Sequence, residues 1–188
     1  MKLYSCVTGA DRGLGFELAK ALLEDGYTVF AGRYNKDWKL LDKLSEKYPD
    51  SLYIVDLDVS SDTSVKAAAE FISSRTDRID VLVNNSAISG NYDPTIFDEL
   101  DFDEMLRVFN VNCLGATRVT NALIRLIMNS EKKLIMNISS EAGSISTCYR
   151  KGWFAYCGSK AALNMHSAIV IQQRLIDQYR CPVRGIDL

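Results

Sequence analysis

The sequence predicts an α/β fold in which a doubly wound parallel sheet of about six strands carries helices on both faces. Short apolar runs rich in β-branched and aromatic residues alternate with longer stretches of helical periodicity. The short runs are apolar at nearly every position, as in strands that are buried on both faces. A length of 188 residues fits one hydrophobic core, so a single domain over residues 1–188 is expected.

Six segments have the length and composition of strands. They lie at about residues 3–8, 28–32, 52–57, 81–84, 134–138 and 183–188. Helices are predicted after Gly13, over residues 38–48, after residues 60–62, over about residues 101–128 with a bend near Gly115, and over about residues 153–178. Ser or Asp at 60–62 can cap the third helix. Residues 86–100, which contain Gly90 and Pro94, are predicted to form a loop.

The composition is that of an ordinary globular protein. The net charge is -2 and 24% of the residues are charged, which offers no polybasic face, so neither nucleic acid nor anionic lipid is an expected partner. Apolar stretches such as residues 119–128 are interrupted before the roughly 20 apolar residues of a membrane span, and the start lacks a signal-peptide run. A cytoplasmic protein is expected. Five scattered cysteines and one histidine predict no disulfide framework and no metal site.

A glycine-rich turn is predicted where the first strand meets the first helix. Its candidate ligand contacts are Gly9, Asp11, Arg12, Gly13, Leu14 and Gly15. Glycine permits tight turns and close approach of a ligand, and the helix start offers unpaired amides and a positive dipole end. This context favours pyrophosphate binding over an ordinary strand-to-helix turn.

The spacing Thr-Gly-x-x-x-Gly-x-Gly, which begins at Thr8, resembles the cofactor fingerprint of the short-chain dehydrogenase/reductase family. The resemblance extends over almost the whole chain, with five motifs in the family's order, and implies a Rossmann-like oxidoreductase with a nicotinamide cofactor. The family normally continues through a loop at the nicotinamide, a substrate lid and a last helix and strand. We therefore expect the domain to be truncated at or after its sixth strand.

The end of the second strand bears on the choice of cofactor. An acidic side chain there binds the adenosine ribose in proteins that prefer NAD, but residues 27–36 contain no carboxylate. Arg33 and Arg12 together can form a cationic clamp on a 2′-phosphate. NADP(H) is therefore favoured over NAD(H), the alternative being that both arginines are merely solvated at the sheet edge.

Tyr156 and Lys160 lie four residues apart on a predicted helix, so both side chains occupy one face. A phenol has a pKa of about 10 and carries protons poorly at neutral pH unless a cation lowers that pKa. We expect Lys160 to do so. The pattern alone also occurs on solvated helices, but here it resembles the family's active-site helix, whose Lys binds the nicotinamide ribose as well.

The resemblance implies two further catalytic residues. Ser140, the second serine after the fifth strand, takes the role of holding the substrate oxygen, with Ser139 and Ser144 as weaker substitutes. It precedes Tyr156 by sixteen residues, which is longer than the common family spacing, so a reshaped pocket wall is expected. Asn112 matches the family Asn that holds a water in a proton relay to the Lys, and a structural amide at a kink is the alternative.

Three more residues are carried over as cofactor contacts. Asp58, followed by Val59, matches the family Asp that binds the adenine amino group, unless it caps a helix. Asn84 is expected to brace the sheet or contact the cofactor. The family has Ala-Gly where this chain has Ser86 and Ala87, so the cofactor ribose is expected to be more crowded.

These assignments imply a hydride transfer between NADP(H) and a small carbonyl or alcohol substrate, with Tyr156 as general acid and base. The alternative is a noncatalytic NAD(P)-binding regulatory or interaction protein of the same fold. The two long late helices permit a homodimer, although a core role for their apolar residues is equally compatible with the sequence. These residues are Leu114, Val119, Leu123, Leu163, Ile169 and Ile171.

Overall fold

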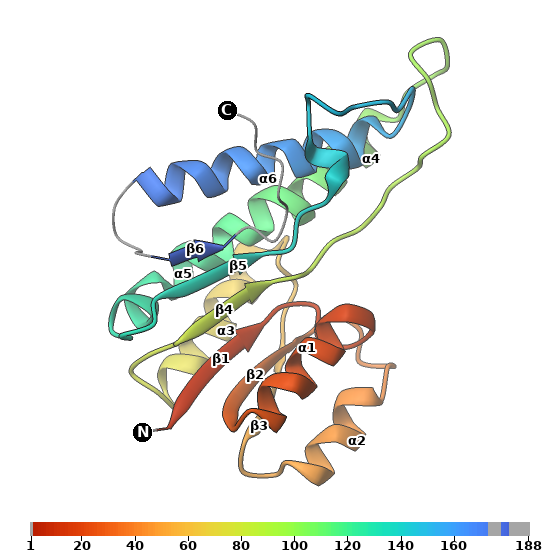
Figure 1. Ribbon diagram of the computed structural model, residues 1–188. Helices are drawn as coiled ribbons and strands as arrows, with labels where there is room; N and C mark the ends of the chain where they lie inside the picture. Colours follow the sequence, from red (N-terminus) through yellow and green to blue (C-terminus); the bar gives the residue numbers. More distant parts are fainter. Residues whose placement is uncertain (1, 173–177, 181–188) are drawn as a thin grey trace.

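The computed structural model describes residues 2–172 and 178–180. Six parallel strands form one sheet in the order β3-β2-β1-β4-β5-β6. The strands are β1 (Leu3–Val7), β2 (Tyr27–Arg33), β3 (Leu52–Asp56), β4 (Val81–Asn84), β5 (Leu134–Asn137) and β6 (Gln178–Arg180). Helices run between them along the sheet (Figure 1), which confirms the predicted fold class.

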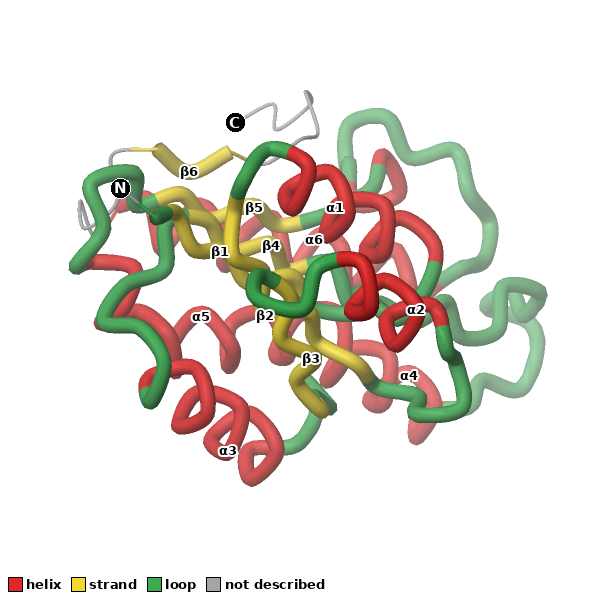
Figure 2. The backbone as a smooth tube through the Cα atoms, turned by 90° about the horizontal axis from the view of Figure 1, so that it is seen from below, coloured by secondary structure: helices red, strands yellow, loops and turns green. Residues whose placement is uncertain are grey.

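Helices cover both faces of the sheet, as Figure 2 shows. They are α1 (Gly13–Glu24), α2 (Leu40–Lys47), α3 (Asp62–Ser73), α4 (Phe102–Phe109), α5 (Gly115–Met128) and α6 (Phe154–Gln172). Successive strand residues point to opposite faces, so Cys6 belongs to the core that α3 and α5 cover, whereas Val7 belongs to the core under α1 and α2. This explains why the strands are apolar at consecutive positions.

The helix expected over residues 101–128 is interrupted. A π-helical turn, Asn110–Leu114, separates α4 from α5 and ends directly before Gly115, where a bend was expected. At Gly115 an added Cβ would lie 2.7 Å from a methyl carbon of Val59. A glycine therefore lets α5 approach the end of β3 closely, and the irregular turn brings Asn112 to the interior.

The helix expected over residues 153–178 is wrong at its end. The described part of α6 is Phe154–Gln172, and Gln178 pairs in parallel with Leu134 in the sheet instead of belonging to a helix. Pairing with the edge of β5 satisfies the backbone hydrogen-bonding groups of residues 178–180. The helical periodicity of the sequence does not reveal such a pairing with a distant strand. The strand expected at residues 183–188 lies outside the described residues.

The strand order places a crevice beside β1. The chain runs outward through β2 and β3 and then crosses to β4 on the other side of β1. At such a switch point the loops after neighbouring strands separate, and ligands of doubly wound sheets bind there. The loops that follow β1 and β4 contain Gly9 and Asn85, which places the predicted glycine turn at the crevice.

Candidate active site

A groove of about 640 Å³ lies at the crevice. Its lining includes the glycine turn, the end of β3 and the loop after β4: Gly9, Asp11, Arg12, Gly13, Leu14, Tyr34, Trp38, Leu57, Asp58, Val59, Ser60, Asn85, Ser86, Ala87, Ile88, Arg107 and Val111. Seven of the twelve predicted cofactor contacts are among these residues. Gly15, Arg33, Asn84, Tyr156 and Lys160 do not line this groove.

The glycine turn needs its glycines for space and for backbone conformation. Gly9 and Gly13 adopt positive φ of 61° and 55°, which L side chains rarely tolerate. A Cβ on Gly15 would lie 2.1 Å from the carbonyl oxygen of Gly9. Gly15 therefore lies directly beneath the turn and allows its tight path, rather than facing the groove.

Two polar residues hold the turn in place. The buried carboxylate of Asp11 accepts hydrogen bonds from the backbone amides of Tyr34 and Asn35, at 2.9 and 2.8 Å, and so ties the turn to the end of β2. The side-chain amide of Asn85 donates to the carbonyl oxygens of Thr8 and Gly9 at 3.1 and 3.0 Å. Sequence analysis missed Asn85, although its place beside Asn84 at a strand end was a usable signal.

The two arginines predicted to clamp a phosphate have different surroundings. The guanidinium of Arg33 donates to Asp56 at 3.0 Å and to Asp42 at 3.2 Å, so two carboxylates compensate its charge. Arg12 lines the groove, with its guanidinium 4.2 Å from the ring centre of Trp38. Arg33 is thus engaged by two carboxylates and does not line the groove, and the two-arginine clamp stays a prediction.

Asp58 lines the groove but does not cap α3. The helix cap is Ser61, whose side chain accepts from the Ser64 amide. The Asp58 carboxylate instead accepts from the amide and the hydroxyl of Ser60, at 2.9 and 2.6 Å. This holds a tight turn at the groove and excludes the helix-capping interpretation.

Asn84 belongs to a buried polar network below the crevice. Its amide donates to the hydroxyl of Thr120 at 3.0 Å and to the Asn137 side chain at 2.8 Å, and the Asn137 amide donates to Ser167. These bonds connect β4 and β5 with α5 and α6. Of the two roles expected for Asn84, this geometry fits the bracing of the sheet.

A second hollow, of about 550 Å³, continues the groove toward α6. The two hollows share Arg12, Ala87, Ile88 and Arg107, and the second also includes Tyr92 and Tyr156. The phenol of Tyr156 therefore faces the same continuous depression as the glycine turn. This is the juxtaposition that the two motifs predict.

The Tyr156 phenol lies near two expected partners, Ser140 and Lys160. It is hydrogen-bonded to the hydroxyl of Ser140. The Lys160 ammonium lies 5.7 Å from the ring centre and donates to the Ile138 carbonyl oxygen at 2.7 Å. Lys160 itself is only 2% exposed. The structure thus brings Ser140, Tyr156 and Lys160 together.

The pKa of Tyr156 is raised above its ordinary value, mainly because burial disfavours the phenolate. The Ser140 hydrogen bond lowers this pKa, and the charges of Tyr92 and Glu141 raise it further. Burial is thus the main influence on this pKa, and a lowering of it by Lys160 stays a prediction. Tyr156 is a protonated phenol at neutral pH.

Asn112 lies in the π-helical turn and is 1% exposed. Its side-chain oxygen Oδ1 accepts from the backbone amide of Ile88 at 2.8 Å. Its side-chain nitrogen Nδ2 donates to the Ile88 carbonyl oxygen at 2.8 Å and to the Ser159 hydroxyl at 3.0 Å. It thereby fastens the groove-lining loop to α6. This geometry fits the structural alternative for Asn112.

Glu141 and Arg150 were not predicted as site residues. The Ser140 hydroxyl donates to the Glu141 carboxylate at 2.6 Å, and Arg150 forms an ion pair with the same carboxylate. The pKa of Glu141 is lowered by the hydrogen bonds from Ser140 and Arg150. Sequence analysis missed both residues because they lie in the longer segment between Ser140 and Tyr156, for which no motif exists.

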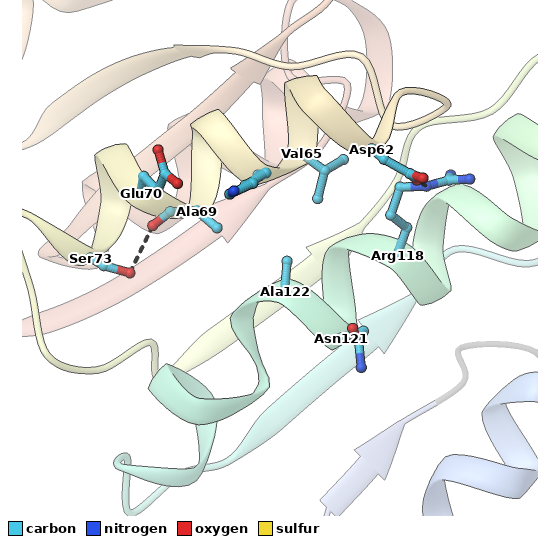
Figure 3. A pocket seen from close by; sticks show the side chains of 9 residues that line it. Asp62, Val65, Ala69, Glu70, Ser73, Arg118, Asn121 and Ala122 are labelled. Atoms are coloured by element: carbon cyan, nitrogen blue, oxygen red, sulfur yellow. Dashed lines mark hydrogen bonds and ion pairs between the residues drawn. The ribbon is translucent and has the colours of Figure 1, made fainter.

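A separate hollow lies between α3 and α5. Figure 3 shows Arg118 on α5 pointing toward Asp62 on α3, with which it forms an ion pair. None of the predicted site residues lines this hollow. Within residues 2–172 and 178–180, no group of three or more His, Cys, Asp or Glu side chains could hold a metal ion. Over the same residues, no helix has the length and apolarity to cross a membrane.

Comparisons with known proteins agree with this geometry. A family model described as short chain dehydrogenase matches residues 4–174. A short-chain dehydrogenase of Penicillium roqueforti is 32% identical over 178 residues, covering 87% of this chain and 69% of that protein. The (-)-isopiperitenone reductase of Mentha piperita is 32% identical over 182 residues, covering 76% of this chain and 58% of that protein.

Solved structures show the same architecture. An NADPH-bound carbonyl reductase from chicken fatty liver is 30% identical, with a TM-score of 0.83, covering 93% of this chain and 72% of that one. A short-chain dehydrogenase/reductase from Burkholderia multivorans with bound NADP is 28% identical, with a TM-score of 0.81, covering 96% and 77%.

Proposed function

Because the chain belongs to the short-chain dehydrogenase/reductase family, we propose that it transfers a hydride between NADP(H) and a carbonyl or alcohol substrate. One observation carries the proposal. The phenol of Tyr156 and the glycine turn at Gly9 and Gly13 face one continuous depression. A cofactor held at the turn would therefore share its depression with a proton donor.

The glycine turn fits a pyrophosphate. Gly13 lines the groove, and no atom lies within 4 Å of the position that a Cβ on Gly13 would take. The start of α1 has no side-chain cap at Arg12, so its first amides can receive a phosphate. Gly9, Asp11, Arg12, Gly13 and Leu14 line the groove and would hold the phosphates, and Gly15 would support the turn from beneath. Asp58 and Val59 would hold the adenine end, and Lys160 and Tyr156 the nicotinamide ribose.

A preference for NADP(H) rests on Arg12. Arg12 lines the groove, with its guanidinium 4.2 Å from the ring centre of Trp38, and a guanidinium suits a phosphate geometrically. No carboxylate follows β2 before Asp37. The NADPH-bound carbonyl reductase and the NADP-bound Burkholderia protein support the same choice.

The chain's own residues would perform the proton chemistry. The nicotinamide, when bound, supplies or accepts the hydride. Tyr156 donates its phenolic proton to the substrate oxygen when a carbonyl is reduced, and accepts a proton from the hydroxyl when an alcohol is oxidised. Ser140 orients the phenol, and Lys160, held by Ile138, keeps a positive charge near it. Asn112 holds Ile88, which lines the site.

The decisive experiment follows NADPH absorbance with aldehydes and ketones for the wild type and for Tyr156→Phe. We expect the variant to lose about 10²–10⁴-fold in kcat, the range for removal of a general acid, with the Kd for NADPH unchanged. Equal rates would exclude Tyr156 from the mechanism. NADPH binding without turnover in either protein would instead support a noncatalytic NAD(P)-binding protein.

Two broader expectations stay predictions. A homodimer through α5 and α6 would use Leu114, Ile169 and Ile171, which are exposed, because Val119, Leu123 and Leu163 are buried in the fold. A cytoplasmic location is the second. Analytical ultracentrifugation and cell fractionation test them.

A further inference from the structure

Two aromatic rings stand next to the Tyr156 phenol. The rings of Tyr92 and Trp153 are stacked, with centroids 4.0 Å apart and an interplanar angle of 22°. Both meet Tyr156 edge to face, at 6.1 Å and 89° for Tyr92 and at 6.2 Å and 78° for Trp153. Tyr92 also lines the hollow that Tyr156 faces.

We propose that Tyr92, held against Trp153, is a specificity-determining residue that selects carbonyl compounds with an aromatic ring next to the carbonyl over short aliphatic ones. The inference rests on the proposed function, because it names the substrate class of that site. A ring on the carbonyl carbon can pack against Tyr92 while the oxygen reaches Tyr156. A short aliphatic chain offers little surface to the stacked rings of Tyr92 and Trp153, which we call the aromatic wall.

The backbone shows that this pair is built into the fold. Trp153 has a φ of +66°, in the left-handed region that non-glycine residues rarely adopt. Such a conformation is energetically unfavourable and persists only where its surroundings enforce it. The carbonyl oxygen of Trp153 accepts from the amide of Cys157 at 2.9 Å, in the first turn of α6. The indole is therefore fixed at the start of the helix that contains Tyr156.

Close backbone contact joins the two loops that supply the rings. A Cβ on Gly152 would lie 2.8 Å from the Pro94 carbonyl oxygen and 2.9 Å from that of Tyr92. Only glycine permits this approach, so the loop after β4 is pressed against the residue before Trp153. The stacked pair is thus held from both sides, although its members lie far apart in the sequence.

The wall is also connected to the proton donor's partner. The Arg150 guanidinium lies 4.6 Å from the Trp153 ring centre and pairs with Glu141, which accepts from Ser140. Ser140 in turn is hydrogen-bonded to Tyr156. The aromatic pair and the reacting phenol therefore share one set of contacts, and the wall has a defined place relative to the reacting oxygen.

The first test compares Tyr92→Leu with Tyr92→Phe, using acetophenone and 2-butanone as substrates. We expect Tyr92→Leu to lower kcat/KM for acetophenone about tenfold, mainly through KM, because an aromatic pair contributes on that order. Tyr92→Phe should retain the wild-type value, and 2-butanone should change less than twofold in both variants. Equal losses for the two ketones would overturn the proposal.

The role of Trp153 is tested through Tyr92. Leu and Phe both have a Cβ and meet the same difficulty at the positive φ of residue 153. The variants Trp153→Leu and Trp153→Phe therefore differ mainly in the presence of an aromatic ring. If Trp153 positions Tyr92, then Trp153→Leu as a single substitution lowers the ratio of kcat/KM for acetophenone to that for 2-butanone. The same substitution added to Tyr92→Leu should change this ratio little. Additive losses would show that Trp153 acts independently, and would overturn its assignment as a positioning residue.

A binding measurement separates this proposal from the proposed reaction. The chain has two tryptophans, so Trp38→Phe leaves Trp153 as the only one. Acetophenone should quench its fluorescence saturably, 2-butanone should not, and Tyr92→Leu should weaken the acetophenone effect about tenfold. Saturable quenching without turnover would support the wall while contradicting the proposed reaction. Absence of saturable quenching would overturn the wall, whether or not turnover occurs.

Discussion

The Ser140 hydroxyl directs its hydrogen to the Glu141 carboxylate over 2.6 Å. A serine hydroxyl has one hydrogen, so Glu141 competes with the Tyr156 oxygen for it. The hydrogen bond from Ser140 lowers the pKa of Tyr156, whereas the charge of Glu141 raises it. Glu141 therefore opposes ionisation of the phenol in two ways.

This relationship predicts the pH dependence of alcohol oxidation, in which the phenolate accepts a proton. Glu141→Gln removes the charge and Glu141→Leu removes the acceptor as well, so both lower the pKa of Tyr156. The rising limb of kcat/KM against pH should move to lower pH in both variants, and the shift should be larger for Glu141→Leu than for Glu141→Gln. Arg150→Gln leaves Glu141 uncompensated and should move the limb to higher pH. Shifts of equal sign in all three variants would contradict this account.

The contrast between Arg12 and Arg33 predicts how the cofactor is chosen. Arg12→Ala should raise the Kd for NADPH about 10- to 100-fold, the loss expected for a hydrogen bond to a charged group, and leave the Kd for NADH nearly unchanged. Arg33→Ala is the matched control because it removes the same charge from a guanidinium that Asp42 and Asp56 engage. Isothermal titration measures both constants. A comparable or larger effect at Arg33 would favour the two-arginine clamp.

Two glycines predict opposite effects on stability. Gly15→Ala places a Cβ against the Gly9 carbonyl oxygen and should lower the free energy of unfolding by about 1–3 kcal/mol, together with NADPH binding. Gly158→Ala has no neighbour within 4 Å and lies in α6, so it should raise that free energy by about 0.5–1 kcal/mol. Urea denaturation measures both. An unchanged free energy of unfolding in Gly15→Ala would show that the turn can shift to accept the added methyl group.

Asn112 can be assigned by separating stability from activity. Asn112→Ala leaves the amide and carbonyl of Ile88 without their partner, at about 1–3 kcal/mol for each buried group left unpaired. Asn129→Ala is the control, because Asn129 is exposed and makes one bond to the Asp77 carbonyl. It should change the free energy of unfolding by no more than about 0.5 kcal/mol. Unchanged stability with lost turnover in Asn112→Ala would instead favour the proton relay.

Local patterns were sufficient for most of the fold. Strands buried on both faces are continuous apolar runs, and glycine spacing at the β1 to α1 turn reflects backbone conformations that few other residues adopt. The end of α6 could not be predicted in this way. Residues 178–180 pair with β5, and a partner strand from a distant part of the chain decided their conformation.

What the sequence by itself determined is the fold class, the glycine turn and the shared face of Tyr156 and Lys160, because these depend on residues a few positions apart. Only the tertiary structure decided that Asp42 and Asp56 engage Arg33, that Glu141 competes for the Ser140 hydrogen, and that Tyr92 stacks on Trp153. Most of these partners come from separate elements. Their charges and rings act over a few ångströms of space, and sequence spacing does not encode such distances.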